Sequence, residues 1–180
     1  NGTMDAVLPV YESAAIGSFY NASLVVAVEN MLASTSNRQW HPVALEIGAG
    51  TGGTASSLVP VLQHCCQRYV FTDVSEIFIR QARLRFARYA CIHYALLNID
   101  ASPILQGFAA SSCDMIVATN VLHATPFMRN TLHHCEQLLK NGGMLLVNEL
   151  TLTDAFAQIS FGMTDGWWLF HESQDPDRLG

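Results

Sequence analysis

Short apolar runs alternate with segments of helical periodicity along most of the chain. The apolar runs lie at residues 43–47, 69–72, 93–97, 115–118 and 144–147. Between them, residues 54–62, 76–89 and 128–139 repeat apolar side chains with the period of an amphipathic helix. Residues 11–32 predict a further helix before the first run. Strands that are apolar on both faces and alternate with helices predict a parallel sheet covered by helices on both sides.

This order of elements predicts an α/β fold with a doubly wound, mostly parallel sheet. We divide the chain into a helical lead-in over residues 1–40, a Rossmann-like core over 41–150 and an aromatic-rich segment over 151–180. Lysine in a last helical turn and glycine just beyond it are typical of a helix C-terminus. We therefore expect the helix at 128–139 to be closed by residues 140–143.

Composition narrows the class of protein. Half of the 180 residues are apolar and 13% are charged, which suits one folded domain with a sizeable core and argues against disorder. The formal net charge is −6, and we find no basic patch or Lys/Arg run, so we expect no nucleic-acid partner. We find no signal peptide and no apolar stretch of the roughly 20 residues that a membrane helix needs, so we expect no membrane association and a cytoplasmic location.

The five cysteines form no recognisable metal or redox motif. No two of them have the C-x-x-C spacing that zinc sites and redox pairs use, so we predict no metal site. We interpret them as reduced thiols that pack as small apolar side chains.

The most informative segment is the glycine-rich turn after the first apolar run. Gly48, Gly50 and Gly52 form a G-x-G-x-G pattern between a predicted strand and a predicted helix. Such glycines adopt positive φ and let a ligand approach the backbone, and the helix N-terminus beyond them offers unpaired N–H groups. Glu46 lies inside the end of the apolar strand, where an unpaired carboxylate is costly. We expect it to meet a bound cation or a loop amide.

Asp73 closes the second apolar run and can accept hydrogen bonds from two ribose hydroxyls. A nicotinamide-dinucleotide site is one interpretation, since Gly53 keeps its longer glycine spacing available. It is disfavoured because Glu46 would repel a pyrophosphate. A carboxylate there suits the ammonium group of S-adenosylmethionine, so we predict a site for that cofactor.

Several segments of the chain resemble one known family. They match the methyltransferase domains embedded in modular polyketide synthases: E-I-G-A-G-T-G-G-T, F-T-D-V-S, S-S-C-D-M-I-V-A-T-N-V-L-H-A-T, L-K-N-G-G-M-L-L-V-N-E-L and F-G-M-T-D-G-W-W-L-F. The resemblance runs from about Tyr11 to the end of the chain. The glycine loop identifies only the class I methyltransferase superfamily, and the N-V-L-H-A-T, N-E-L and G-W-W-L-F segments make the narrower assignment.

The resemblance implies a site at the carboxyl ends of the strands. His123 would remove a proton from the substrate, and Glu149 would orient its imidazole. From the residues alone, a histidine after a strand can equally cap a helix, and we expect His133 and His134 on the solvent side of their helix. The residues implied in cofactor binding are Glu46, Gly48, Ala49, Gly50, Gly52, Asp73, Val74, Asn98, Ile99, Asp100 and Asn120. The family often has Asp where this chain has Asn98, so the contact with the adenine amine is expected from Asn98 or from Asp100.

The same resemblance implies the reaction. It is S-adenosylmethionine-dependent methylation at the α-carbon of a β-ketoacyl chain on an acyl carrier protein, with neighbouring synthase domains as further partners. O-methylation of a β-hydroxyl or enol could use the same two residues, and an inactive scaffold domain is a third interpretation. Class I sheets usually end in an antiparallel strand pair. Because we count five strands, we expect that pair to be missing from this chain.

Overall fold

Five parallel strands form a single sheet at the centre of the molecule. The computed structural model describes residues 15–34 and 40–149. The strands are β1 (Val43–Ile47), β2 (Arg68–Asp73), β3 (Ile92–Leu96), β4 (Cys113–Thr119) and β5 (Leu139–Asn148). They lie in the order β3-β2-β1-β4-β5, and each neighbouring pair is parallel. The strand order reverses between β1 and β4, and in open α/β sheets ligands bind outside the carboxyl ends of the strands at such a point.

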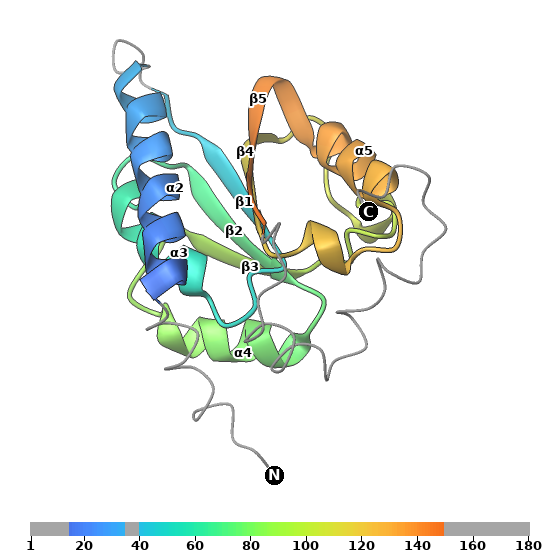
Figure 1. Cartoon of the computed structure of the whole chain (residues 1–180), viewed down its shortest axis with the longest axis horizontal. Helices are drawn as coiled ribbons and strands as arrows, with labels where there is room; N and C mark the ends of the chain where they lie inside the picture. The colour runs from blue at the N-terminus through green and yellow to red at the C-terminus, as the bar shows by residue number, and fades with distance from the viewer. Residues whose placement is uncertain (1–14, 35–39, 150–180) are drawn as a thin grey trace.

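Helices cover both faces of the sheet, as the sequence predicts (Figure 1). The helices are α2 (Ala15–Ser34), α3 (Gly53–Leu62), α4 (Glu76–Arg85) and α5 (Met128–Leu138), with 3-10 turns η2 (Ile104–Gln106) and η3 (Leu122–Ala124). The first three helices pack into one apolar cluster and α5 into another, on opposite sides of the strands. None of the helices within the described ranges is long and apolar enough to span a membrane.

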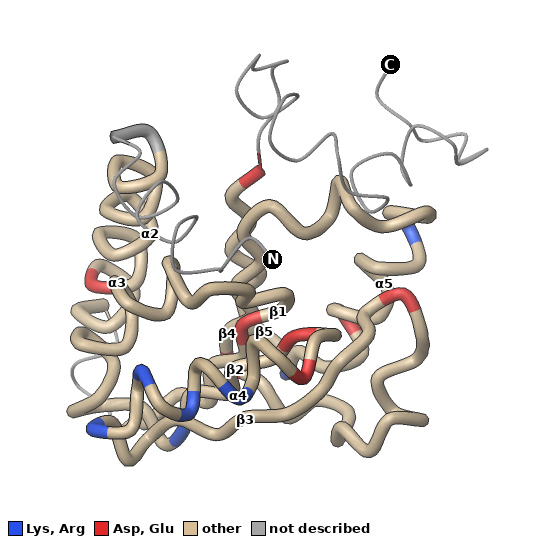
Figure 2. The backbone as a smooth tube through the Cα atoms, turned by 90° about the horizontal axis from the view of Figure 1, so that it is seen from below, with Lys and Arg blue, Asp and Glu red and all other residues tan. Residues whose placement is uncertain are grey.

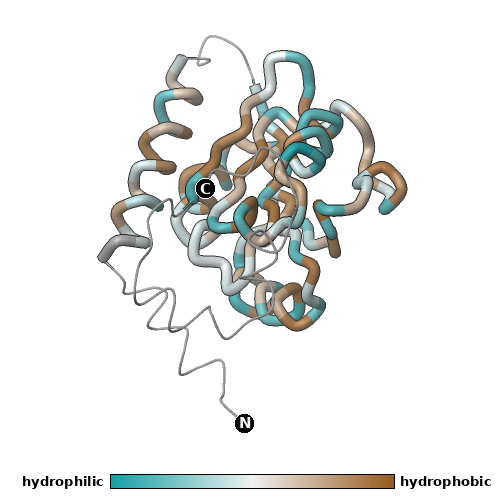
Figure 3. The backbone as a smooth tube through the Cα atoms, turned by 45° about the vertical axis from the view of Figure 1, so that its right-hand side comes forward, coloured by the Kyte–Doolittle hydropathy of each residue, from teal (hydrophilic) through white to brown (hydrophobic). Residues whose placement is uncertain are grey.

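Alternation along β1 shows why both faces of this strand are largely apolar. Ala44 contributes to the cluster beneath α2, α3 and α4, whereas Val43, Leu45 and Ile47 contribute to the cluster beneath α5. All four side chains are at most 3% exposed. Hydrophobic segments accordingly follow the central strands (Figure 3). A strand buried on both faces is apolar at nearly every position, and the buried Glu46 is the exception in β1. The parallel pairing of β1 with β2 and β4 confirms the predicted sheet.

The end of α5 corrects the predicted helix stop. The helix ends at Leu138, and Leu139 is already extended and pairs with Cys113 of β4. The regular register resumes at Met144, so residues 140–143 form an irregularity inside β5. The N–H groups of Ser111 and Ser112 donate to the carbonyls at the end of α5 at 2.9 Å each. The loop before β4 therefore satisfies the helix end, and the glycines beyond it are not needed for that purpose.

The predicted helix over residues 76–89 is also too long. The structure ends α4 at Arg85, because Phe86 leaves the helical conformation and its ring turns toward the glycine loop. Predicted residues 11–14 and the aromatic-rich segment 151–180 lie outside the described residues. The expected absence of a final strand pair, and the division into lead-in, core and tail, stay predictions.

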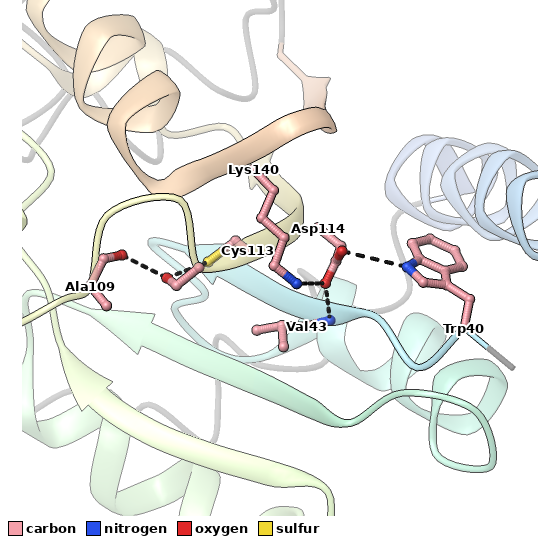
Figure 4. A network of polar contacts seen from close by, with 7 residues as sticks. Trp40, Val43, Ala109, Cys113, Asp114 and Lys140 are labelled. Atoms are coloured by element: carbon pink, nitrogen blue, oxygen red, sulfur yellow. Dashed lines mark hydrogen bonds and ion pairs between the residues drawn. The ribbon is translucent and has the colours of Figure 1, made fainter.

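A polar network fastens the amino-terminal edge of the sheet (Figure 4). Asp114 accepts hydrogen bonds from the Val43 N–H at 2.8 Å, the Lys140 ammonium at 2.7 Å and the Trp40 indole at 3.4 Å. Burial would raise the pKa of Asp114, but the hydrogen bonds from Lys140 and Val43 outweigh it and hold the pKa below its usual value. The Asp114 carboxylate thus joins the start of β4 to residues 40–43 and to Lys140 of β5, which lie far apart in the sequence.

Candidate active site

The glycine loop after β1 has the backbone geometry that the sequence predicts. Gly48, Gly50 and Gly52 have φ of +57°, +53° and +83°. The loop is closed by the Gly52 N–H, which donates to the Ala49 carbonyl at 2.9 Å, and the Ala49 N–H donates to Thr72 of β2 at 2.9 Å. A Cβ atom built on Gly50 would meet only the Gly48 carbonyl, at 3.9 Å. Gly50 therefore offers the side of the loop that a ligand can approach.

The other two glycines are required by contacts within the protein. A Cβ atom on Gly52 would lie 2.7 Å from the Phe86 ring, and one on Gly48 would lie 2.7 Å from Cγ2 of Val121. Real Cβ atoms do not approach other atoms so closely. Glycine is thus needed at both positions for close packing as well as for positive φ. The sequence pattern indicated the positive φ but not the packing.

Asp73 ties the loop to the end of β2. Its Oδ2 accepts the Gly50 N–H at 2.8 Å and its Oδ1 accepts the Ser75 N–H at 2.8 Å. The residue is 5% exposed. Each carboxylate oxygen has two lone pairs, so a further donor can still bind. The loop and Asp73 consequently lie at one sheet edge, at the carboxyl ends of adjacent parallel strands.

Glu46 is buried beneath this loop, and its partner differs from the expected one. The Tyr69 hydroxyl donates to Glu46 Oε2 at 2.7 Å, and a backbone hydrogen bond from Ala55 of α3 adds to it. Burial, with a smaller contribution from the nearby Asp73 charge, raises the pKa of Glu46 to about 8, although the hydrogen bonds from Tyr69 and Ala55 oppose the rise. The protein thus supplies a tyrosine of β2 and an amide of α3 in place of the expected loop amide, and the expected contact with a bound cation is untested. The cofactor contact predicted for Glu46 stays a prediction, since its side chain is inside the core.

The segment after β3 is folded around its own side chains. Asn98 Oδ1 accepts the Asp100 N–H at 3.0 Å, while Gln106 accepts the Asn98 N–H at 2.9 Å and donates to the Asn98 carbonyl at 2.8 Å. Asn98 and Asp100 are exposed and Ile99 is buried. Val74, directly after β2, is 68% exposed. Gln106 holds this turn in place, and no sequence signal marked it.

His134 does not lie on the solvent side of α5. Its Nδ1 lies 2.7 Å from the Ile99 carbonyl oxygen, so this half-buried ring braces the turn after β3. Burial raises the pKa of Asp100, and His134 opposes that rise. His133, by contrast, is exposed beside Glu136, as expected. Helical periodicity could not distinguish His134 from His133, because the contact of His134 with Ile99 depends on where the fold places the turn after β3.

The ends of β4 and β5 bring the two predicted catalytic residues together. His123 lies in η3, and its Nδ1 is 2.6 Å from Glu149 Oε2. Glu149 Oε1 accepts the N–H groups of Val121 and Leu122 at 2.7 Å each. The His123 and Glu149 side chains are 26% and 14% exposed. The carboxylate is therefore fixed by the backbone and in turn fixes the imidazole.

Asn120 precedes this pair in a conformation that non-glycine residues rarely adopt. Its φ is +53°, and its N–H donates to the Asn148 carbonyl of β5 at 2.8 Å. The side chain is exposed at the carboxyl end of β4. Strained residues of this kind are found at functional sites.

Comparison with known proteins assigns the family. The model of a family described as a methyltransferase domain matches residues 45–145, which contain the glycine loop, Asp73 and His123. The chain belongs to this methyltransferase domain family.

The relatives of this methyltransferase domain include polyketide synthases. Polyketide synthase ThaQ of Burkholderia thailandensis is 38% identical over 94% of the chain, and PksM of Bacillus subtilis is 34% identical over 96%. The chain spans 8% and 4% of their lengths. Among solved structures, the CurJ carbon methyltransferase has a TM-score of 0.86 at 33% identity, covering 93% of this chain and 44% of its own. The DszA carbon methyltransferase has 0.85 at 32%, with 93% and 44% covered.

In this methyltransferase domain, one contact joins the two halves of the candidate site. Val121 packs against Gly48 of the loop and donates its N–H to Glu149. The loop and the His123–Glu149 pair therefore share one edge of the sheet.

Proposed function

We propose that this domain uses S-adenosylmethionine to methylate the α-carbon of a β-ketoacyl chain held by an acyl carrier protein. The observation that carries the proposal is the 2.6 Å contact between His123 Nδ1 and Glu149 Oε2, at the same sheet edge as the glycine loop. The polyketide synthase relatives support an acyl substrate. The solved neighbours described as carbon methyltransferases support carbon over oxygen as the acceptor.

The residues present fit the proposed cofactor. Gly48 to Gly52 would receive its methionine part with Ala49 and Asn120, and Asp73 has lone pairs left for the ribose hydroxyls. Val74, Asn98, Ile99 and Asp100 would border the adenine. When bound, S-adenosylmethionine supplies a methyl group already activated on a sulfonium. Glu46 would complete the site for the methionine part from below the loop, where it also holds Tyr69 and α3 in place.

His123 would supply the proton transfer that the reaction requires. A β-keto methylene is a poor nucleophile until a base removes its proton. Because the Glu149 carboxylate accepts from Nδ1–H, the basic lone pair of the imidazole is on Nε2. The same carboxylate stabilises the imidazolium formed when Nε2 takes the proton. Glu149 itself stays fixed by the Val121 and Leu122 N–H groups.

Two measurements test this proposal. Calorimetric titration of S-adenosylmethionine separates an enzyme from a scaffold, because a folded scaffold would bind none. Mass spectrometry of a β-ketoacyl carrier protein then follows methyl transfer. We expect His123→Ala to abolish transfer with cofactor affinity unchanged, and the exposed His133→Ala to retain both. Transfer retained by His123→Ala would remove this histidine from the mechanism.

A further inference from the structure

Positive charge is concentrated on and just after α4. Four of the nine Lys and Arg residues of the chain fall within nine positions: Arg80, Arg83, Arg85 and Arg88. All four are exposed, although the chain as a whole carries −6. Figure 2 shows the blue segments gathered along and beside α4. The expectation that the chain has no basic patch is thus wrong: apolar residues interrupt the arginines in the sequence, and the fold brings the arginines to one surface.

Three of these arginines carry charge that the described part of the chain does not neutralise. Within it, no carboxylate lies within ion-pair distance of Arg80, Arg83 or Arg88. The Arg83 guanidinium lies 4.8 Å from the Tyr94 ring centroid, and that of Arg88 lies 4.8 Å from the Tyr89 centroid. Stacking on an aromatic ring orients a guanidinium without cancelling its charge. The cations are held at the surface, available to an acidic partner.

This surface adjoins the candidate active site. The helix begins at Glu76, close after Asp73, and its last residue reaches back to the glycine loop. Arg85 donates to the Thr51 carbonyl at 2.9 Å and to the Ser56 hydroxyl at 2.8 Å. A protein docked on α4 would therefore be beside the edge where the methyl transfer is proposed.

We infer that Arg80, Arg83 and Arg88 form a docking surface for an acidic face of the protein that carries the acyl substrate. The inference rests on the proposed function and adds the chemistry by which the carrier is recognised. A complementary charge patch steers the encounter of two proteins and fixes their register. An acidic protein fits better than nucleic acid, because the net charge of −6 would repel a polyanion that extends past the short arginine segment.

The test compares a protein-bound substrate with a free one. In the full-length protein, Arg80, Arg83 and Arg88 are replaced together by Gln, and Arg85 is kept because it contacts the loop. KM and kcat are measured for a β-ketoacyl chain on a separately added acyl carrier protein and for the same chain on pantetheine. We expect the carrier KM to rise about tenfold. The kcat, the pantetheine kinetics and the affinity for S-adenosylmethionine should stay unchanged.

Matched variants make each outcome decisive. Arg68→Gln, which removes an exposed arginine at the start of β2, should leave the carrier KM unchanged. If the triple variant folds poorly by circular dichroism, Arg80→Gln alone should still raise the carrier KM two- to threefold. An unchanged carrier KM in both variants overturns the docking surface but leaves the proposed function standing. No methylation of either substrate by the wild type overturns the function instead, and binding of duplex DNA more tightly than carrier overturns the acidic-protein partner.

Discussion

A Cβ atom built on Gly48 would lie 2.7 Å from Cγ2 of Val121, so the glycine loop and the segment that leads to His123 are packed as one unit. Val121 also donates its N–H to Glu149 at 2.7 Å. The loop and the Glu149 carboxylate are thus joined through one residue, by the side chain of Val121 on one side and by its backbone N–H on the other. We therefore expect a change at the loop to affect the proposed proton transfer as well as the proposed cofactor binding.

Replacing Gly48 with Ala should impair both halves of the site. The added methyl would push on Val121, and the φ of +57° would cost about 1–2 kcal/mol in a residue with a Cβ. We expect the dissociation constant of S-adenosylmethionine to rise about tenfold or more by calorimetry, with a lower kcat. Adding Val121→Ala should restore part of both losses, because it relieves the clash but not the φ strain. No recovery in the double variant would contradict the packing argument.

Glu149→Gln should lower kcat and spare binding. The amide oxygen can still accept the Val121 and Leu122 N–H groups, but the amide NH₂ cannot accept from His123 Nδ1–H or stabilise an imidazolium. We expect kcat to fall about 100-fold or more, with the affinity for S-adenosylmethionine unchanged. Glu149→Ala should in addition lower the melting temperature, since it leaves two N–H groups without their acceptor. A Glu149→Gln variant with wild-type kcat would argue against an orienting carboxylate.

The sequence indicated the strands well, because strands depend on local patterns, whereas the roles of the site residues were implied by the family resemblance and stay predictions. The apolar run of β1 matches the observed strand residue for residue, and His123 and Glu149 each follow a strand whose end could be recognised. What could not be foreseen depends on which distant residues meet. Tyr69 reaches Glu46 only through the β1–β2 register. Lys140 was expected to close α5, but it lies in β5, where its ammonium group binds Asp114. The arginines of α4 form a surface only once Ile79, Ala82 and Phe86 are buried.

Glu46 should make the folded state less stable as the pH rises. Its folded pKa of about 8 lies above the ordinary value of 4.5, so between these values the unfolded state has released a proton that the folded state retains. The contribution of Glu46 to the free energy of unfolding is therefore full below about pH 4.5 and falls toward pH 8, by up to about 1.4 kcal/mol per pH unit. Urea unfolding from pH 5 to 9 should show that slope reduced in Glu46→Gln and retained in Glu29→Gln, an exposed residue of α2. Equal slopes in all three proteins would show that Glu46 is ionised in the folded state.

His134→Ala should weaken cofactor binding without slowing proton transfer. The ring supports the Ile99 carbonyl from α5, and the turn it supports is where we propose the adenine lies. We expect the dissociation constant of S-adenosylmethionine to rise about five- to tenfold, equivalent to about one hydrogen bond, with kcat at saturation unchanged. His133→Ala, one position away and exposed, is the control. An unchanged affinity in His134→Ala would place the adenine elsewhere.

Asp114, at the amino-terminal ends of the strands, should make the free energy of unfolding fall at low pH. Its folded pKa is depressed, so its contribution is present above the ordinary value of 3.8 and is lost as the pH falls through the folded pKa. Asp114→Ala leaves the Val43 N–H without its acceptor and should lower the free energy of unfolding by about 2 kcal/mol at pH 7. Asp114→Asn can still accept that N–H and loses only the charge of the Lys140 pair, so it should cost less. Denaturant unfolding at pH 7 and pH 3 tests this order. Because the carboxylate gains its proton as the pH falls toward its folded pKa, which lies below 3.8, the gap between wild type and Asp114→Asn should narrow from pH 7 to pH 3, and a gap that stays constant would mean that the ion pair does not contribute.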